Sequence, residues 1–262
     1  MDKRIIGTIQ RINGPVITAS GITDARMFEL VYVSDDLLVG EVIKLSGSSA
    51  VIQVYEDTTG LKPGSPIYGS GMPLSLALGP GLIGSIYDGI QRPLEVLRAY
   101  SGHFIKRGIA AKALASDKKW HFVPAVQKGI DLHGGAIIGT VQETSRIVHK
   151  IIVSPDISGR LLSIVPEGDY SVEEPIAVIE NSQQKKEITM TQYWPIRIPR
   201  PVRARRALEI PLITGQRVID TLFPLAKGGT VAIPGGFGTG KTMTQHAIAK
   251  WCDADIIVYI GC

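Results

Sequence analysis

The stretch Gly235-Gly236-Phe237-Gly238-Thr239-Gly240-Lys241-Thr242 constrains this chain more than any other. It fits the pattern G-x-x-x-x-G-K-[ST], a glycine-rich loop that binds nucleotide phosphates. The apolar residues 230–233 predict a buried strand before the loop, and residues 241–251 predict a helix after it. A second apolar run, residues 256–260, predicts another strand. This order is the context that the pattern needs, because a parallel return requires a crossover helix.

The residue types predict the chemistry of this loop. Glycines let backbone N–H groups wrap an anion without Cβ clashes, and the start of the helix adds unpaired N–H groups. We expect Lys241 to act as the catalytic cation at the β and γ phosphates, and the Thr242 hydroxyl to bind Mg²⁺. The predicted nucleotide-binding residues are Gly235, Gly236, Phe237, Gly238, Thr239, Gly240, Lys241, Thr242 and Met243. The alternative is a structural glycine turn that happens to precede a lysine.

Composition excludes several classes of protein. Of the 262 residues, 44% are apolar and 20% are charged, and the formal net charge is only +4, which by itself does not indicate nucleic-acid binding. Cys252 and Cys262 show no metal-site or disulfide spacing, which fits a reducing cytosol. The start of the chain does not resemble a signal peptide. The most apolar tract, residues 74–86, is broken by glycine and proline, so we expect membrane association only through partners.

The first part of the chain, residues 1–72, predicts a small closed β-barrel. β-branched runs at residues 5–9, 16–19, 29–33, 41–45 and 50–55 are separated by turn residues, without a helical period. An oligonucleotide-binding fold would have the same pattern. The four aromatic residues are not interleaved with a basic stripe, so we expect them to pack in the core rather than to stack on bases. They are Phe28, Tyr32, Tyr55 and Tyr68.

Two further segments precede the nucleotide region. Residues 73–112 form a loop-rich approach with a helix predicted over residues 92–99, in which Pro93 lies in the first turn. Residues 113–190 return to β-strand signals, predicted at residues 120–124, 136–141, 148–153, 159–165 and 175–179. This block predicts a β-rich insertion. The three histidines of this block, and the one in the segment that precedes it, lack the spacing of metal ligands. We therefore interpret them as surface or hydrogen-bonded residues. They are His103, His121, His133 and His149.

The last part, residues 191–262, begins with an extended, proline-braced stretch. Five arginines between residues 197 and 206 raise a nucleic-acid interpretation, but no second basic run supports it. We therefore expect a connector whose arginines face acidic neighbours or a subunit interface. A helix is predicted over residues 213–222, with Thr214 as the N-cap and Val218, Ile219 and Leu222 on one face.

Several motifs in order resemble the catalytic A subunit of A-type and V-type rotary ATPases, over the whole chain. They lie at residues 79–82, 88–94, 194–195, 211–217, 220–224, 235–242 and 259–262. The resemblance implies a multidomain β plus α/β protein: an N-terminal β-barrel, a β-rich bulge insertion and a truncated RecA-like P-loop nucleotide-binding domain. It also implies ATP or ADP and Mg²⁺ as ligands, and ATP hydrolysis or synthesis coupled to H⁺ or Na⁺ transport. The domains would span residues 1–72, 73–112 with 191–262, and 113–190.

The resemblance implies partners as well. Family members of this kind alternate with B subunits in an A₃B₃ hexamer, with an arginine finger from the neighbouring B subunit. They contact central-stalk subunits and reach a membrane sector through them, so we expect a peripheral protein on the cytoplasmic face of a membrane. Neither nucleic acid nor direct membrane insertion is implied.

The sequence departs from the family pattern at two places. Gly236 stands where the family usually has proline, which would leave the loop less preorganised. In the family, a glutamate that acts on the attacking water follows the position of Cys262, so we expect little turnover from this chain alone. Some members carry an intein that begins at that cysteine, which suggests a split or interrupted gene. We also expect an incomplete sheet that exposes apolar surface.

Two alternatives remain at this point. A Rho-like RNA translocase also joins a small barrel to a RecA core, although the β-rich insertion and the aromatic-poor barrel disfavour it. A non-catalytic nucleotide-binding assembly subunit is the other; the intact Lys241-Thr242 pair disfavours it.

Overall fold

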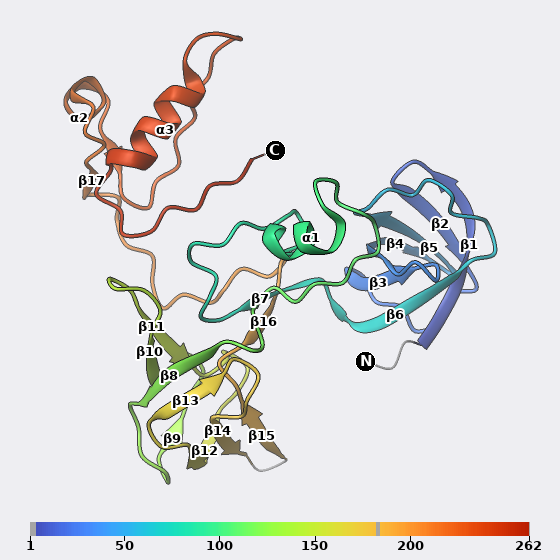
Figure 1. Cartoon of the computed structure of the whole chain (residues 1–262), viewed down its shortest axis with the longest axis horizontal. Helices are drawn as coiled ribbons and strands as arrows, with labels where there is room; N and C mark the ends of the chain where they lie inside the picture. The colour runs from blue at the N-terminus through green and yellow to red at the C-terminus, as the bar shows by residue number, and fades with distance from the viewer. Residues whose placement is uncertain (1–3, 182–183, 262) are drawn as a thin grey trace. The chain divides into compact units, whose positions relative to one another are not determined.

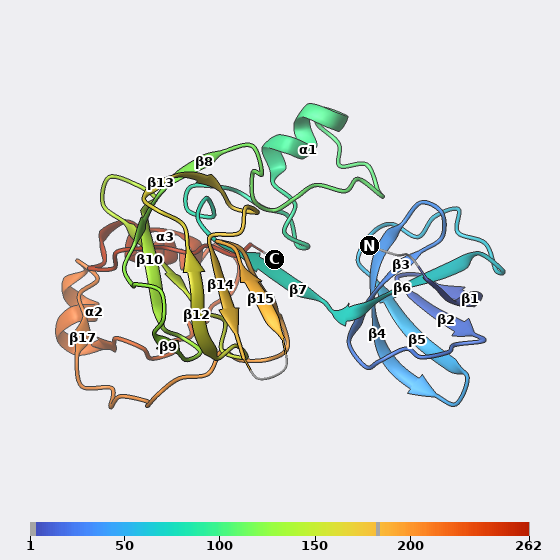
Figure 2. The same cartoon turned by 90° about the horizontal axis from the view of Figure 1, so that it is seen from below.

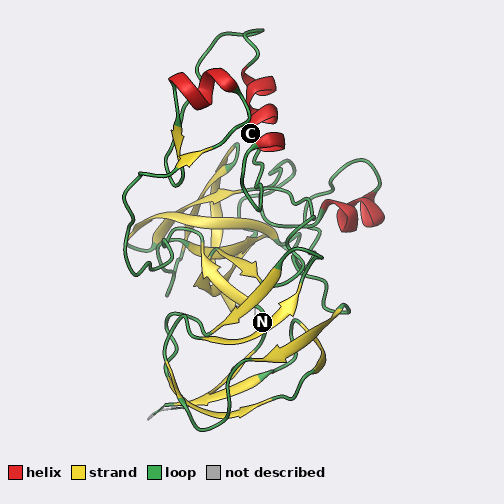
Figure 3. Ribbon diagram, turned by 90° about the vertical axis from the view of Figure 1, so that its left-hand side faces the viewer, coloured by secondary structure: helices red, strands yellow, loops and turns green. Residues whose placement is uncertain are grey.

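A computed structural model describes residues 4–181 and 184–261. Cys262 lies outside the described residues. The expectations about the family glutamate after this position and about an intein that begins at it therefore fall outside them as well. The chain divides into two compact units, residues 1–200 and residues 201–262. Strands dominate the first unit, and the second carries two of the helices (Figures 1 and 3).

The N-terminal part of the first unit is a closed antiparallel barrel, as predicted (Figure 1, blue to cyan). Its strands follow the order β1-β2-β5-β4-β3-β6 around the barrel, so the sheet has no free edge. They are β1 (Arg4–Asn13), β2 (Val16–Ser20), β3 (Glu29–Val33), β4 (Leu38–Ser46), β5 (Ser49–Val54) and β6 (Pro66–Pro73). The strand β6, which closes the barrel against β1 and β3, was not predicted.

The barrel core is aliphatic, so the prediction that its aromatic residues pack inside was wrong. The interior is filled by side chains such as Ile17, Val31, Leu38, Ile52 and Ile67, all fully buried. Alternation along each strand places these residues inward, and the interior of a six-stranded barrel has room only for compact side chains. The four aromatic residues instead lie on the outer surface, half-buried or exposed.

Two strands and a helix connect the barrel to the next domain. Strand β7 (Ser75–Leu78) leaves the barrel and pairs antiparallel with β16 (Gln192–Pro195), so the outgoing and returning chains lie side by side. Helix α1 (Leu94–Ser101) has Pro93 as its N-cap residue, close to the predicted position, and buries Leu97. The domain carried by these connections is thus an insertion, as predicted.

The insertion consists of two four-stranded antiparallel sheets that share one core (Figure 2). One sheet has the order β11-β10-β8-β13 and the other β15-β14-β12-β9. The strands are β8 (Lys119–Pro124), β9 (Asp131–Leu132), β10 (Ile137–Gln142), β11 (Val148–Ile152), β12 (Gly159–Ile164), β13 (Gly168–Ser171), β14 (Ala177–Glu180) and β15 (Lys185–Ile188). Phe122, Ile138 and Val141 from the first sheet are buried against Leu161 and Ile179 from the second.

Close packing in this core leaves no room for a side chain at Gly139 of β10. A Cβ at this position would overlap the ring of Phe122, which is fully buried, and would lie 2.8 Å from the carbonyl oxygen of Val123. We expect Gly139→Ala to lower the free energy of unfolding by about 1–3 kcal/mol, because the ring has no space to move into. Urea unfolding checks this, with Gly89→Ala as the control, since a Cβ at Gly89 meets nothing within 4 Å. Equal losses in both variants would contradict the prediction.

The second unit has less regular structure than predicted. It contains a two-stranded antiparallel sheet of β17 (Pro211–Leu212) and β18 (Leu225–Ala226), with helices α2 (Arg217–Leu222) and α3 (Lys241–Trp251). Helix α3 has the predicted bounds. Helix α2 begins later than predicted and its N-cap residue is Gln216, not Thr214; Val218 and Leu222 are exposed.

The strands predicted at residues 230–233 and 256–260 are absent, because a strand requires a hydrogen-bonded neighbour and the described residues provide none. All five side chains of residues 256–260 are exposed, with Val258 and Ile260 each at 80%. Across the described part of this unit, Thr214 is the one buried side chain, so no apolar core forms there. The expected exposure of apolar surface is therefore confirmed.

Candidate functional site: a glycine-rich loop at the start of a helix

The loop of residues 235–240 runs directly into α3, and glycines shape its backbone. Gly238 and Gly240 have φ angles of 79° and 83°, in the left-handed region that glycine adopts without steric cost. Gly240 is also the N-cap residue of α3. Its carbonyl accepts hydrogen bonds from the backbone N–H and the hydroxyl of Thr244, at 3.0 and 3.2 Å. The sharp turn into the helix thus depends on these two glycines.

The backbone of the loop leaves its donors free. Among the described residues, none accepts a hydrogen bond from the backbone N–H groups of residues 236–240. The first N–H groups of α3 add to them, because the first turn of a helix has no internal acceptors for these groups. Consecutive free N–H groups at a positive helix end are a site for an anion.

Three side chains complete the loop. The Lys241 ammonium donates a hydrogen bond to the carbonyl of Gly235, so it folds back over the loop's own first residue. The Thr239 hydroxyl donates to the carbonyl of Gly236 at 2.9 Å and braces the turn. The Thr242 side chain is exposed and makes no hydrogen bond within the described part of the chain. The structure therefore brings the cation and a free hydroxyl to one end of α3.

Two other predicted site residues do not converge on the loop. Phe237 is fully exposed and Met243 is 71% exposed, so neither packs against the glycines. Their place in the predicted set rests on sequence position alone.

A carboxylate network centred on Asp220, which the sequence indicated only as part of the motif at residues 220–224, holds the segment before α2. Asp220 accepts hydrogen bonds from the backbone N–H and the hydroxyl of Thr214, at 2.9 and 2.7 Å, and from the N–H of Gly215 at 3.1 Å. These bonds explain why Thr214 is buried although it does not cap the helix. The sequence signal that points to Asp220 is a helical carboxylate shortly after a Thr-Gly turn.

A second carboxylate, Asp253, ties the C-terminal end of α3 to the same region. Its side chain accepts a hydrogen bond from the N–H of Ile213 at 3.1 Å, and it forms an ion pair of 2.6 Å with Lys227. Both side chains are about two-fifths exposed. Asp253 and Asp220 together fix the far end of α3 and the turn before α2.

The Asp220 network predicts a pH dependence. Hydrogen bonds from the backbone N–H and the hydroxyl of Thr214 hold the pKa of the Asp220 carboxyl below its ordinary value. Because the folded-state pKa is depressed, the contribution to stability is complete above the pKa of the unfolded chain and is lost as pH falls through the folded-state pKa. We expect the Thr214 amide resonance to titrate below the ordinary range of an aspartate. Asp220→Asn should abolish this step, while Asp255→Asn, at an exposed position, should leave it; a midpoint at or above the ordinary value would contradict the account.

The histidines behave as expected from their spacing. His121 contacts Glu167 and Asp169 at 3.0 Å each, and His149 contacts Glu143 at 2.8 Å, while His103 and His133 are exposed. Within the described ranges, no cluster of three or more His, Cys, Asp or Glu residues is arranged to hold a metal ion.

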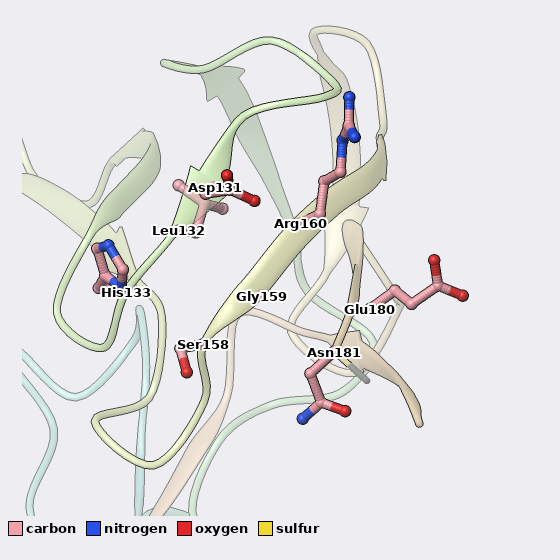
Figure 4. A pocket seen from close by; sticks show the side chains of 8 residues that line it. All are labelled: Asp131, Leu132, His133, Ser158, Gly159, Arg160, Glu180 and Asn181. Carbon is pink, nitrogen blue, oxygen red and sulfur yellow. The ribbon is translucent and has the colours of Figure 1, made fainter. Parts of the chain in front are cut away.

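A shallow hollow at the edge of the insertion is a weaker candidate. It is formed by the sheet edge of β9, β12 and β14 and is lined by Asp131, Leu132, His133, Ser158, Gly159, Arg160, Glu180 and Asn181. Figure 4 shows that the Arg160, Glu180 and Asn181 side chains point away from one another. This divergence gives no common point at which a ligand would be held.

The arginine-rich connector behaves partly as expected. The Arg197 side chain pairs with Glu41, whose side chain is fully buried, at 2.5 Å. Arg200 stacks on Trp194, with 4.7 Å between the guanidinium carbon and the ring centroid.

No helix among the described residues combines the length and the apolar character needed to cross a bilayer.

Comparison with known proteins supplies three domain matches in chain order. Residues 9–71 match the β-barrel domain of the ATP synthase alpha/beta family, residues 111–197 match the alpha/beta subunit barrel-sandwich domain, and residues 215–262 match the family's nucleotide-binding domain. These matches support the barrel, insertion and nucleotide-domain architecture. The domain limits given in the sequence analysis stay a prediction.

Individual relatives agree with these matches. The chain is 56% identical over 258 residues to the A subunit of the A-type ATP synthase from Thermococcus sibiricus, and 53% identical over 261 residues to its counterpart from Methanoculleus marisnigri. These alignments cover 98% and 100% of this chain but 44% of each relative, so the chain spans less than half the length of these proteins. The solved structure of the ATPase EscN from the enteropathogenic E. coli type III secretion system matches 95% of this chain and 40% of EscN, with a TM-score of 0.51 at 18% identity, which bears on the fold alone.

Proposed function

We propose that this chain, which belongs to the ATP synthase alpha/beta family, supplies the phosphate-binding part of the catalytic subunit of an A-type or V-type rotary ATPase. The activity of the whole subunit would be ATP hydrolysis or synthesis coupled to H⁺ or Na⁺ transport. One observation carries the proposal: the N–H groups of residues 236–240 have no acceptor among the described residues, and the Lys241 ammonium, at the start of α3, folds back onto the Gly235 carbonyl of the same loop.

Each loop residue has a role that follows from its atoms. The backbone N–H groups of residues 235–240 would hold the phosphate oxygens, because they are preorganised and have no competing acceptor among the described residues. Lys241 would leave the Gly235 carbonyl and donate to the β and γ phosphates, where it offsets the charge that develops during phosphoryl transfer. Phe237 and Met243 would lie at the margin of this site.

The loop and the start of α3 offer one residue that fits as a ligand of Mg²⁺. The Thr242 hydroxyl is exposed and free of hydrogen bonds within the described residues, and it lies in the first turn of α3 beside Lys241. A hard oxygen ligand at this position suits Mg²⁺, which keeps several waters and binds few protein groups. When bound, the ion neutralises phosphate charge; Thr242 would orient it relative to the loop.

The assembly proposed for the whole subunit is an A₃B₃ hexamer in which A subunits alternate with B subunits and enclose a central stalk. Contact with the ion-translocating membrane sector would run through these partners, which places the protein at the cytoplasmic face of a membrane. The barrel-sandwich insertion favours this assembly over a Rho-like RNA translocase, and its match to the family's sandwich domain supports that choice.

Nucleotides that differ only in phosphate number test the proposal. We expect the whole chain to bind ATP and ADP in the presence of Mg²⁺ at least about tenfold more tightly than AMP, because AMP lacks the phosphates that Lys241 would contact. Isothermal titration calorimetry gives the three dissociation constants. Equal affinity for AMP and ATP would contradict the proposal, as would the absence of binding by all three.

A further inference from the structure

A cavity in the first unit contains none of the residues of the glycine-rich loop. Its volume is about 230 Å³, and it lies where the barrel meets the returning segment after β16. The residues that line it are Arg26, Met27, Phe28, Glu29, Glu41, Gly71, Met72, Pro73, Leu74, Pro195, Arg197 and Ile198. Cavities that bind drug-sized molecules usually occupy about 300–1,000 Å³, so this one fits a single large side chain better.

The rim of the cavity is apolar and adaptable. Met27, Met72 and Ile198 line it and are 44%, 46% and 54% exposed. Methionine side chains are unbranched and polarisable, so they adjust to the shape of an inserted group. Apolar side chains exposed around a concave site are typical of protein interaction surfaces.

A strained aromatic residue forms part of the wall. Phe28 has a φ of 64°, a conformation that is a steric outlier for a bulky side chain. Its N–H donates to the Val42 carbonyl at 2.9 Å, and its carbonyl accepts from the Leu74 N–H at 3.2 Å. The Arg197 guanidinium lies over the ring at 4.7 Å from its centroid. Barrel and returning segment together therefore hold the ring at the cavity, although the local backbone disfavours this.

The charged groups of the cavity leave one cation available. Glu29 accepts hydrogen bonds from the N–H groups of Arg26 and Gly71, both at 2.8 Å. Glu41 accepts from the Arg197 guanidinium, at 2.8 and 2.5 Å, and from the Tyr55 hydroxyl at 2.8 Å. Both carboxylates thus already accept hydrogen bonds from the chain's own donors. The Arg26 side chain, in contrast, has no ion-pair or hydrogen-bond partner within residues 4–181 and 184–261.

We propose that this cavity docks a partner protein segment that inserts one aliphatic or aromatic side chain and places a carboxylate next to it. The apolar wall would bury the inserted side chain. Arg26 would pair with the carboxylate, because it is the exposed, unpaired charge among the lining residues. The site is independent of the nucleotide loop.

Short capped peptides test the proposal on the whole chain labelled with ¹³C at its methionine methyl groups. The probe is acetyl-Gly-Leu-Glu-Gly-amide, compared with the same peptide carrying lysine for the glutamate or serine for the leucine. Met27 and Met72 report on the cavity, while the buried Met190 and the distant-in-sequence Met243 serve as internal references. We expect saturable shifts of the two cavity methyl groups, with a dissociation constant on the order of 1 mM.

Two charge-reversal variants distinguish specific docking of the peptide from nonspecific binding. Arg26→Glu should weaken binding of the leucine–glutamate peptide by about tenfold, and Arg11→Glu, at an exposed barrel position outside the cavity, should leave it within about twofold. An unchanged Met190 resonance shows that each variant is folded. The proposal is overturned if no shift saturates below about 10 mM, if the serine peptide binds equally well, or if toluene alone shifts the same methyl groups and Arg26→Glu has no effect on the peptide.

Discussion

Replacing Arg92 by alanine should lower the free energy of unfolding of the first unit by about 3–5 kcal/mol. The Arg92 side chain is 9% exposed and pairs with Asp88 at 2.7 Å and with Glu56 at 2.9 Å, whose side chains are 12% and 4% exposed. It also donates to the carbonyl of Ile109 at 3.1 Å. Removing the guanidinium leaves two buried carboxylates without a counter-charge. This uncompensated charge causes the loss of stability.

Glu56 extends the ion-pair network of Arg92 to residues that are far apart in the sequence. Its carboxylate also accepts hydrogen bonds from the N–H groups of Gly108 and Val39, at 2.9 and 3.2 Å, so one group joins the barrel to the segment around α1. Urea unfolding of Arg92→Ala measures the effect, and Arg11→Ala, at an exposed position, is the control. Adding Glu56→Gln to Arg92→Ala should recover part of the stability, because it removes one buried carboxylate that has lost its counter-charge. A loss below about 1 kcal/mol in Arg92→Ala, as for a surface ion pair, would contradict this account.

Local patterns were sufficient to predict most of the first unit. Runs such as residues 29–33 and 50–55 are β-branched and bounded by turns, and these properties determine a strand wherever a neighbour is available. Strand β6 escaped prediction because Gly69 and Gly71 interrupt its apolar alternation and a proline stands at each end. Strand β15 is mostly polar, and pairing with β14 rather than its own pattern makes it a strand.

The second unit shows the limit of local prediction. The glycine loop and α3 follow from residues that are close together in sequence, because positive φ angles and helix-start geometry are local properties. The strands at residues 230–233 and 256–260 have suitable composition, but a strand also depends on partners that the described residues lack. The glycine loop and α3 thus formed without the predicted sheet, and phosphate binding by this loop stays a prediction.

Contacts between distant residues could not be predicted from spacing. Residues 88–94 form one of the family-like motifs, yet nothing in this motif indicates that Arg92 reaches Glu56, 36 residues away. The same holds for Arg197 and Glu41, and for Asp253 and Lys227. Such pairs depend on how the chain returns on itself, which hydrophobic periodicity does not encode.

Lys241→Ala should weaken the binding of MgATP to the whole chain by roughly 30-fold, equivalent to about 2 kcal/mol for the loss of a charged hydrogen-bond donor. The Lys241 ammonium already lies over the loop, as its bond to the Gly235 carbonyl shows, so binding of phosphate would require only a local movement of this side chain. The glycines and the start of α3 remain in the variant, which should therefore retain weak binding.

The most direct test of the phosphate-binding loop is the MgATP dissociation constant of the unmodified chain, Lys241→Ala and Lys250→Ala, measured by calorimetry under identical conditions. Lys250 is the matched control because it lies in the last turn of the same helix, with its ammonium 4.9 Å from the centroid of the Trp251 ring. We expect a roughly 30-fold loss for Lys241→Ala and a change within about twofold for Lys250→Ala. Unchanged affinity in Lys241→Ala, or equal losses in both variants, would contradict this expectation.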